Sequence, residues 1–247
     1  RMINLEVPKK FQVLVGQAHQ VAEEVLRPIS RKYDRAEHEY PKELDMLAAM
    51  IDGLEDSGQS SGAGAAGVQR ESGNGDGGNR NGSNLSTVLS IMEMCWGDVG
   101  LTLTMPRQGL GNSAIASVAD DEQRERFKGK WAAMAITEPE AGSDSAAIRA
   151  TAELDGDEYV LNGEKIFVTS GDRADLLVVW ATLDREQGRA AIKSFVVDRH
   201  AEGVKLDRLE HKLGIRASDT ANFVLDNVRV PKENLLGSPE IDTKKSF

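Results

Sequence analysis

Two short segments of the chain place hydroxyl and glycine residues directly after apolar runs. The first, residues 137–144, reads Thr-Glu-Pro-Glu-Ala-Gly-Ser-Asp and follows the apolar run 132–136. The second is the end of the apolar run 166–168, which is followed by Thr169 and Ser170. Hydroxyls donate hydrogen bonds without adding charge, and glycine lets a backbone approach a ligand closely. The two segments therefore have the residue types that hold a polar ring or a phosphate group.

A flavin ring needs donors of this kind. When the ring accepts a hydride at N5, negative charge builds toward N1 and the C2 carbonyl, where fixed N–H and O–H donors stabilise it. Thr137 is predicted to be one such donor, and Ser143, after Gly142, is predicted to donate to a pyrophosphate oxygen. The alternative is that both strings are ordinary turns between a helical region and a strand.

The segments that follow favour the flavin-binding interpretation over ordinary turns. Residues 151–169 predict a tight meander of strands with turns at Asp155-Gly156 and Asn162-Gly163. With these motifs in order, residues 135–237 resemble the acyl-CoA dehydrogenase family. The motifs that carry the resemblance are Thr-Glu-Pro-x-Ala-Gly-Ser-Asp at 137–144, Leu-Asn-Gly-Glu-Lys at 161–165, Thr-Ser-Gly at 169–171, Gly-Ile-Arg-Ala-Ser-Asp-Thr at 214–220 and Phe-Val-Leu-Asp-Asn-Val-Arg-Val-Pro-Lys-Glu-Asn-Leu-Leu-Gly at 223–237.

The resemblance implies an FAD-dependent oxidoreductase of lipid metabolism and fatty acid β-oxidation. A carboxylate removes the α-proton of an acyl-CoA thioester, the β-hydrogen leaves as hydride to flavin N5, and the product is a trans-2-enoyl-CoA. The resemblance also implies an electron-transferring flavoprotein as electron acceptor and a homo-oligomer, either dimer or tetramer. Two alternatives stay open: an acyl-CoA oxidase or flavin monooxygenase of the same fold, and a non-catalytic subunit that contributes half of a flavin/CoA site to a partner.

The resemblance also assigns site residues. It places FAD against Met134, Ala135, Ile136, Thr137, Gly142, Ser143, Phe167, Val168 and Thr169. It places the acyl-CoA against a helix expected over residues 101–114, with Thr102, Pro106 and Leu110 as wall residues and Ser143 as a CoA contact. A core aromatic at Phe167 and a plain core helix at 101–114 are the alternatives.

No Asp or Glu of the chain matches the catalytic base of the family. Family members carry that glutamate in a C-terminal four-helix domain, and only ten residues follow Gly237 here. We therefore expect residues 241–247 to begin a C-terminal helical domain that the sequence lacks, and the chain alone to be inactive.

Composition narrows the classes of function. The 30 Lys and Arg against 40 Asp and Glu give a net charge of −10, which argues against nucleic-acid and anionic-membrane binding. No apolar run reaches the ~20 residues of a membrane span, and one cysteine excludes a disulfide framework, so a cytoplasmic protein is expected. The four histidines lie far apart in sequence and show no metal-ligand spacing, so no metal is predicted.

The pattern of apolar residues changes once along the chain. A helical period predicts helices over 7–33, 41–54 and 84–96, and Asp120 with Gln123 forms a capping-box signature for a helix to Phe127. Residues 57–83, rich in Gly and Ser, are expected to form a flexible loop. From residue 133 the period is two, with strands expected at 176–183, 192–198 and 222–230.

These patterns predict a multi-domain α and β protein. Residues 1–132 are expected to form an α-helical bundle domain, which includes the 57–83 loop. Residues 133–240 are expected to form the flavin-binding middle domain, in which short strands without intervening helices favour an antiparallel barrel or sandwich. The family resemblance favours an antiparallel β-barrel-like domain.

Overall fold

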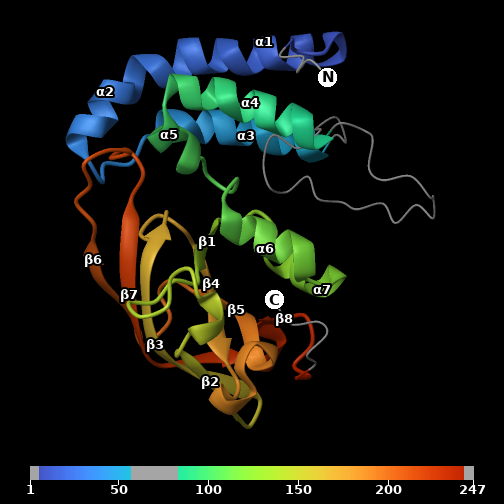
Figure 1. The fold of residues 1–247 in the computed structure, drawn as a ribbon, viewed down its shortest axis with the longest axis vertical. Coiled ribbons are helices and arrows are strands. Elements are labelled where there is room, and N and C mark those ends of the chain that lie inside the picture. The colour runs from blue at the N-terminus through green and yellow to red at the C-terminus, as the bar shows by residue number, and fades with distance from the viewer. Residues whose placement is uncertain (1–5, 57–82, 242–247) are drawn as a thin grey trace, which may run out of the picture.

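The computed structural model of the chain describes residues 6–56 and 83–241. Helices form the first part and a sheet forms most of the second, as expected (Figure 1). The predicted 57–83 loop, apart from its last residue, lies outside the described residues, as do residues 242–247. The helices are α1 (Gln12–Val21), η2 (Ala22–Leu26), α2 (Arg27–Ala36), α3 (Glu43–Asp56), α4 (Ser83–Gly97), α5 (Val99–Leu103), α6 (Leu110–Val118) and α7 (Asp121–Arg126), preceded by a short turn η1 (Lys9–Phe11).

The first helices form where the apolar period predicted them. α1, η2 and α2 follow one another without a break, η2 being a single wider turn. Leu26, Leu44 and Leu101, from three separate segments, are fully buried in one core cluster with Tyr33. At α7 the predicted capping box is confirmed, because the Asp120 carboxylate accepts from Gln123 N and the Gln123 side chain accepts from Asp120 N.

The single helix expected over 101–114 is wrong. α5 ends at Leu103 and α6 begins at Leu110. The connection contains Pro106, which has no N–H to continue a helix, and Arg107, whose φ of 63° is left-handed. Gly109 then caps α6 in an extended conformation. Thr102 and Leu110 therefore belong to different helices, and Pro106 belongs to the loop between them.

The strands make one mixed sheet. They are β1 (Ala132–Ala135), β2 (Thr151–Asp155), β3 (Glu158–Thr169), β4 (Leu176–Thr182), β5 (Ile192–Asp198), β6 (Val204–Leu209), β7 (Thr220–Pro231) and β8 (Leu235–Leu236). Their order is β6-β7-β3-β2-β4-β5-β8, with β1 paired to β4. Most neighbours are antiparallel, but β1 and β2 run parallel to β4, and β6 and β8 are not paired with each other. The strand-rich middle part is confirmed, while the sheet is neither wholly antiparallel nor closed into a barrel.

One of the two predicted turns in the meander is wrong. The chain does turn at Asp155-Gly156, where Gly156 has a φ of 66°. At Asn162-Gly163 it continues as one strand, β3, with a register shift against β7. A Cβ on Gly163 would lie 2.6 Å from the Cβ of Ala150, so glycine here allows two backbones to approach rather than forming a hairpin.

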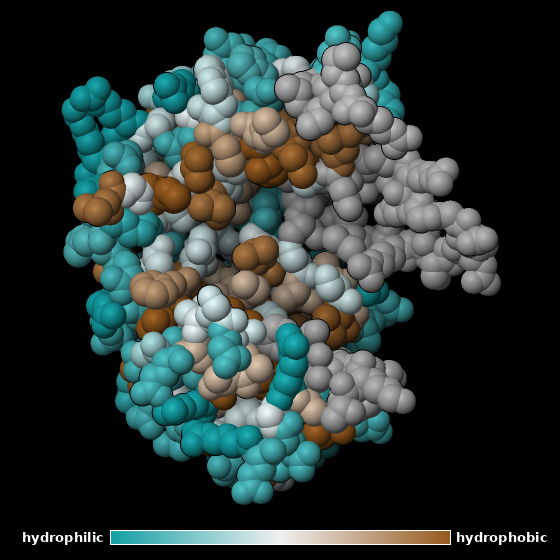
Figure 2. Space-filling model, viewed as in Figure 1, coloured by the Kyte–Doolittle hydropathy of each residue, from teal (hydrophilic) through white to brown (hydrophobic). Residues whose placement is uncertain are grey.

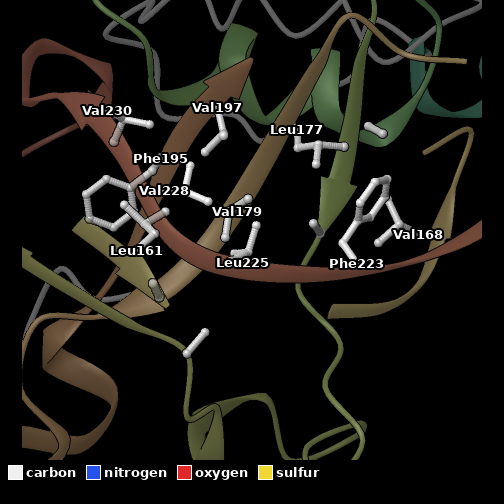
Figure 3. Packing of buried hydrophobic residues seen from close by; sticks show 14 of the residues in the cluster. Leu161, Val168, Leu177, Val179, Phe195, Val197, Phe223, Leu225, Val228 and Val230 are labelled. Carbon is white, nitrogen blue, oxygen red and sulfur yellow. The ribbon is translucent and has the colours of Figure 1, made fainter. Parts of the chain in front are cut away.

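Both faces of the central strands are buried. On one face Leu161, Leu177, Val179, Phe195 and Phe223 point into a shared interior (Figure 3). On the other, Leu176, Val178 and Val196 pack with Ile115 of α6 and with Phe127, which follows α7. The near-continuous apolar sequence of β4 follows from burial on both faces.

The helical part leaves more apolar surface in contact with solvent. Exposed side chains recur on α4 and α5, namely Leu85, Val88, Met92, Trp96, Val99 and Leu103. Apolar residues gather in a band over the helical half of the face in Figure 2. Within the described ranges, no helix combines the length and apolar character needed to span a bilayer.

Candidate functional site

The first predicted loop connects two strands, β1 and β2, that both pair with β4. β1 and β2 both pair with β4, at Ala132–Ala135 and at Thr151 respectively. After β1 the chain stays beside β3 for two residues, because Ile166 N donates to Thr137 O at 2.9 Å. It then leaves the sheet and returns at Ala150, whose carbonyl accepts from Thr182 N at 2.8 Å. Most of the 137–144 segment therefore lies in the excursion between β1 and β2, two strands that share β4 as a neighbour.

A buried ion pair fixes both ends of this excursion. Lys165 Nζ on β3 lies 2.6 Å from Glu138 Oε1 and donates to Ile136 O at 3.1 Å. The Glu138 carboxylate also accepts from the backbone N–H groups of Arg149, at 2.6 Å, and Ala150, at 2.9 Å. Burial lowers the pKa of the Lys165 ammonium, and the Glu138 carboxylate opposes that shift. The pair thus positions Thr137 against β3.

Sequence reasoning assigned no role to Glu138 or Lys165. Both stand inside the quoted motifs, where they read as ordinary charged residues of turns. Their side chains are only 6% and 0% exposed, and charged residues are almost never that buried unless they are paired. The pairing joins residues 27 positions apart, so local spacing carries no signal for it.

The second predicted segment contains a β-bulge that turns Phe167 outward. The β3–β7 register shifts between Lys165 and Val168, and Phe167 has a φ of 58°. Phe167 N donates to Oδ1 of the fully buried Asn222 at 3.0 Å, which supports the bulge from behind. The Phe167 side chain is 58% exposed, so it is not the core aromatic of the alternative interpretation. A non-glycine residue held in this conformation costs about 1–3 kcal/mol and is typical of functional sites.

The end of β3 is fixed by the 214–220 motif. Ser170, with a φ of 58°, donates its N–H to Asp219 O at 3.1 Å. Arg173 Nε lies 3.2 Å from Asp219 Oδ1, a contact close enough for an ion pair but not aligned as a hydrogen bond. Burial raises the pKa of Asp219, and the Arg173 charge opposes that shift. The motif therefore holds the strand end that carries Thr169.

The predicted cofactor residues differ in what they can offer. Ala135 and Val168 are sealed in the sheet core, at 1% and 0% exposed, so they can present only backbone groups. Met134, Ile136 and Thr137 are half-buried. The remaining predicted residues, Gly142, Ser143, Phe167 and Thr169, are exposed. The exposed and half-buried residues lie on the 134–144 segment and the end of β3, which Thr137 O and Ile166 N join.

Residues beside the predicted substrate residues contact that strand end and β1. The Thr104 hydroxyl, just after α5, is 3.4 Å from the Ser170 hydroxyl and accepts from Arg173 at 2.6 Å. Gly111 of α6 packs so closely on β1 that a Cβ there would lie 2.3 Å from Ala132 O. The segment that contains Pro106 therefore runs from the end of β3 to β1. Pro106 is buried and Leu110 is 62% exposed.

A hollow beside the excursion is a separate feature. It is lined by Glu138, Pro139, Glu140, Arg149, Ala150, Thr151, Asn162, Gly163, Glu164 and Arg185. None of the predicted cofactor or substrate residues is in this lining. We therefore do not assign the hollow to the predicted site.

Comparison with known proteins identifies the family of the chain. Residues 9–135 match the family model described as acyl-CoA dehydrogenase, N-terminal domain, and residues 133–228 match acyl-CoA dehydrogenase, middle domain. The chain is 34% identical over 238 residues to a short-chain specific acyl-CoA dehydrogenase of Clostridium acetobutylicum, covering 92% of this chain and 58% of that protein. It is 31% identical over 245 residues to an acryloyl-CoA reductase (NADH) of Anaerotignum propionicum, covering 96% and 58%.

A solved structure gives the same relation. A glutaryl-CoA dehydrogenase of Mycobacterium smegmatis in complex with FADH2 superimposes with a TM-score of 0.74 at 26% identity, covering 94% of this chain and 56% of that one. The chain thus spans 58% of the length of the two curated relatives. With two consecutive family models matched from residue 9 to residue 228, the chain belongs to the acyl-CoA dehydrogenase family.

Proposed function

We propose that this chain forms the flavin- and acyl-CoA-binding part of an FAD-dependent acyl-CoA dehydrogenase. The observation that carries the proposal is the bulge of β3, which exposes Phe167 next to Thr169 beside the strand extension that ends in Thr137. Bound FAD would accept the β-hydrogen of an acyl-CoA as hydride, while a carboxylate base takes the α-proton, leaving a trans-2-enoyl-CoA.

The hydroxyl groups of the site fit a polar cofactor. Among the described residues, the hydroxyls of Thr137, Ser143 and Thr169 have no hydrogen-bond partner. In contrast, the Thr102 hydroxyl donates to Asp98 O at 2.7 Å, and that of Ser170 contacts Thr104. Donors left uncommitted at a site are available to a ligand, whereas the committed ones stabilise the fold.

Each residue of the proposed site has a distinct role. Thr137 donates toward the developing negative charge of the ring, and Met134 and Phe167 provide apolar contact with it. Ser143 donates its hydroxyl hydrogen to the pyrophosphate and contacts CoA. A Cβ at Gly142 would have no heavy atom within 4 Å, so a ligand can approach the backbone there. The buried Ala135 and Val168 contribute backbone groups alone. Ile136, Thr169 and the acyl-wall residues Thr102, Pro106 and Leu110 complete the proposed set.

The proposal extends to the setting of the enzyme. We assign residues 1–132 to a helical domain and 133–240 to a flavin-binding domain. On the family resemblance we propose fatty acid β-oxidation, an electron-transferring flavoprotein as acceptor, a homotetramer and a cytoplasmic location.

A second candidate is the reverse reaction. The relative from Anaerotignum propionicum is named an acryloyl-CoA reductase (NADH), and it matches 96% of this chain. The same site would then deliver hydride to the double bond of an enoyl-CoA. Incubation of the full-length protein with acyl-CoA and oxidised electron-transferring flavoprotein, and separately with enoyl-CoA and NADH, distinguishes the two directions, because only one of these two pairs is consumed at a catalytic rate.

Flavin titration tests the proposal. FAD is added to full-length apoprotein and binding is followed by flavin fluorescence. Thr137→Val removes one hydrogen bond of ~1 kcal/mol and should weaken FAD affinity about fivefold. Thr151→Val, a half-buried threonine on β2, serves as the matched control and should leave the affinity unchanged. Absence of flavin binding by the unmodified protein, or equal losses in both variants, would contradict the proposal.

Activity with a bound flavin tests the reaction class. Addition of acyl-CoA under nitrogen should bleach the flavin band near ~450 nm, as expected when a flavin is reduced. Slow reoxidation in air, with fast reoxidation by an electron-transferring flavoprotein, supports a dehydrogenase. Fast formation of peroxide in air would instead indicate an oxidase.

A further inference from the structure

Three potential metal ligands meet at a junction remote in sequence from both predicted flavin-binding segments. Glu37 and His38 follow α2, and His211 lies in the connection between β6 and β7. In Figure 1 the end of α2 reaches the loop that joins these two strands. One ligand atom from each of the three side chains lies within 4.8 Å of the others.

The backbone at this junction is constrained. α2 ends at Ala36, and the next two residues, Glu37 and His38, have φ values of 40° and 50°. Two consecutive non-glycine residues in the left-handed region are strained, and such strain is typical of sites where the surroundings dictate side-chain placement. Glu37 Oε1 accepts from Lys212 N at 2.9 Å, and Oε2 lies 3.0 Å from His211 Nδ1. The turn thus directs Glu37 onto the loop of the sheet region.

The environment of His38 indicates that a ligand binds there. Both of its ring nitrogens are buried, and neither has a hydrogen-bond partner in the described part of the chain. Its ring centroid is 5.2 Å from that of His211. Buried polar groups are nearly always hydrogen-bonded, because desolvation without a partner is unfavourable. A metal ion bound to one nitrogen would provide one of the two missing partners.

The set of donors matches one chemical class. Two imidazole nitrogens and one carboxylate oxygen are ligands of zinc and similar divalent transition metals. Zinc–ligand bonds of ~2.0–2.1 Å place ligand atoms closer than 4.8 Å, so one side chain must move inward. The His211 side chain is 82% exposed, so the surrounding solvent leaves room for this movement. Arg216, 3.3 Å from Glu37 Oε2, would be displaced from that oxygen while keeping its bond to Asp34 O.

We propose that Glu37, His38 and His211 bind a divalent transition cation of the zinc class and that the ion clamps the helical region to the β6–β7 loop. His38 and His211 are 173 positions apart in sequence, which is why the spacing of the histidines predicted no metal.

Zinc titration of the full-length, chelator-treated protein tests the clamp. Isothermal titration calorimetry should show one zinc ion bound with micromolar or tighter affinity, and zinc should raise the melting temperature. His211→Ala removes an exposed ligand and should weaken binding at least tenfold and abolish the thermal shift. His200→Ala, an exposed histidine in the turn after β5, is the matched control and should bind zinc as the unmodified protein does.

Glu37→Gln provides a second variant of nearly unchanged shape. It should also weaken zinc binding at least tenfold, while the far-ultraviolet circular dichroism spectrum and the flavin content stay unchanged. Stoichiometric zinc binding that survives both Glu37→Gln and His211→Ala would overturn the proposal. So would an unmodified protein that binds zinc no more tightly than either variant.

Discussion

The helical and sheet regions bury their apolar residues to different extents. In the sheet, side chains from β3, β4, β5 and β7 meet in one interior, and α6 covers part of the opposite face (Figure 3). In the helical region a smaller cluster around Leu26 and Leu44 is buried, while α4 exposes Val88 and Met92. Truncation of a side chain should therefore be costly in the sheet and nearly neutral along the exposed face of α4.

The largest expected difference is between Phe195→Ala and Met92→Ala. Phe195 is fully buried and packs edge-on against Tyr159, with the two ring centroids 5.0 Å apart. Its truncation should therefore cost about 3–5 kcal/mol of unfolding free energy. Met92 is 61% exposed, and its truncation should stay within about 0.5 kcal/mol. Urea unfolding measures both. A large loss of unfolding free energy for Met92→Ala would mean that another part of the protein covers α4. The two regions would then not differ in burial as described.

Loss of the buried ion pair of the sheet should lower the unfolding free energy almost as much. Lys165→Met leaves the Glu138 carboxylate buried without its partner and should cost about 3–5 kcal/mol, measured by urea unfolding. Adding Glu138→Gln should restore part of that loss. Lys205→Met breaks the exposed pair with Asp226 and should leave the unfolding midpoint unchanged. Equal effects of the two lysine variants would show that burial is not what makes the Lys165 pair important.

The contact between the two regions should be weakened by any side chain added at Gly111. A methyl group there would lie 2.3 Å from Ala132 O, a backbone atom that cannot rotate away. Gly111→Ala should therefore cost about 1–3 kcal/mol through displacement of α6 from β1. Hydrogen exchange should become faster in β1 and α6 while β7 stays protected. Unchanged exchange in β1 would show that α6 moves without disturbing the strand.

The smallest expected effect is a gain in unfolding free energy from a substitution in the helical region. A Cβ on Gly16 of α1 would have no neighbour within 4 Å. Gly16→Ala should therefore stabilise the helix by about 0.5–1 kcal/mol, because alanine loses less backbone freedom on folding than glycine. Thermal unfolding followed by circular dichroism measures the gain. A loss would indicate that α1 contacts a surface beyond the described residues at this position.

Local features of the fold were predictable because neighbouring residues encode them. The capping box at Asp120 and Gln123 formed as expected, as did the turn at Asp155-Gly156. The helix over 101–114 was wrong because its apolar residues suit two short helices as well as one long one, and Pro106 interrupts the backbone hydrogen bonds. Asn162-Gly163 resembles a hairpin turn, but its glycine serves a close approach to Ala150.

The motifs of the chain by themselves determined the family and the segments that carry its hydroxyl groups. Only the tertiary structure decided which side chains act together: Glu138 with Lys165, Phe167 with Asn222, and His38 with His211. Periodicity and turn residues report interactions along a single segment. A pair that joins distant segments depends on strand register and on the bulges that turn side chains from one face to the other, and these are fixed only when the whole sheet is assembled.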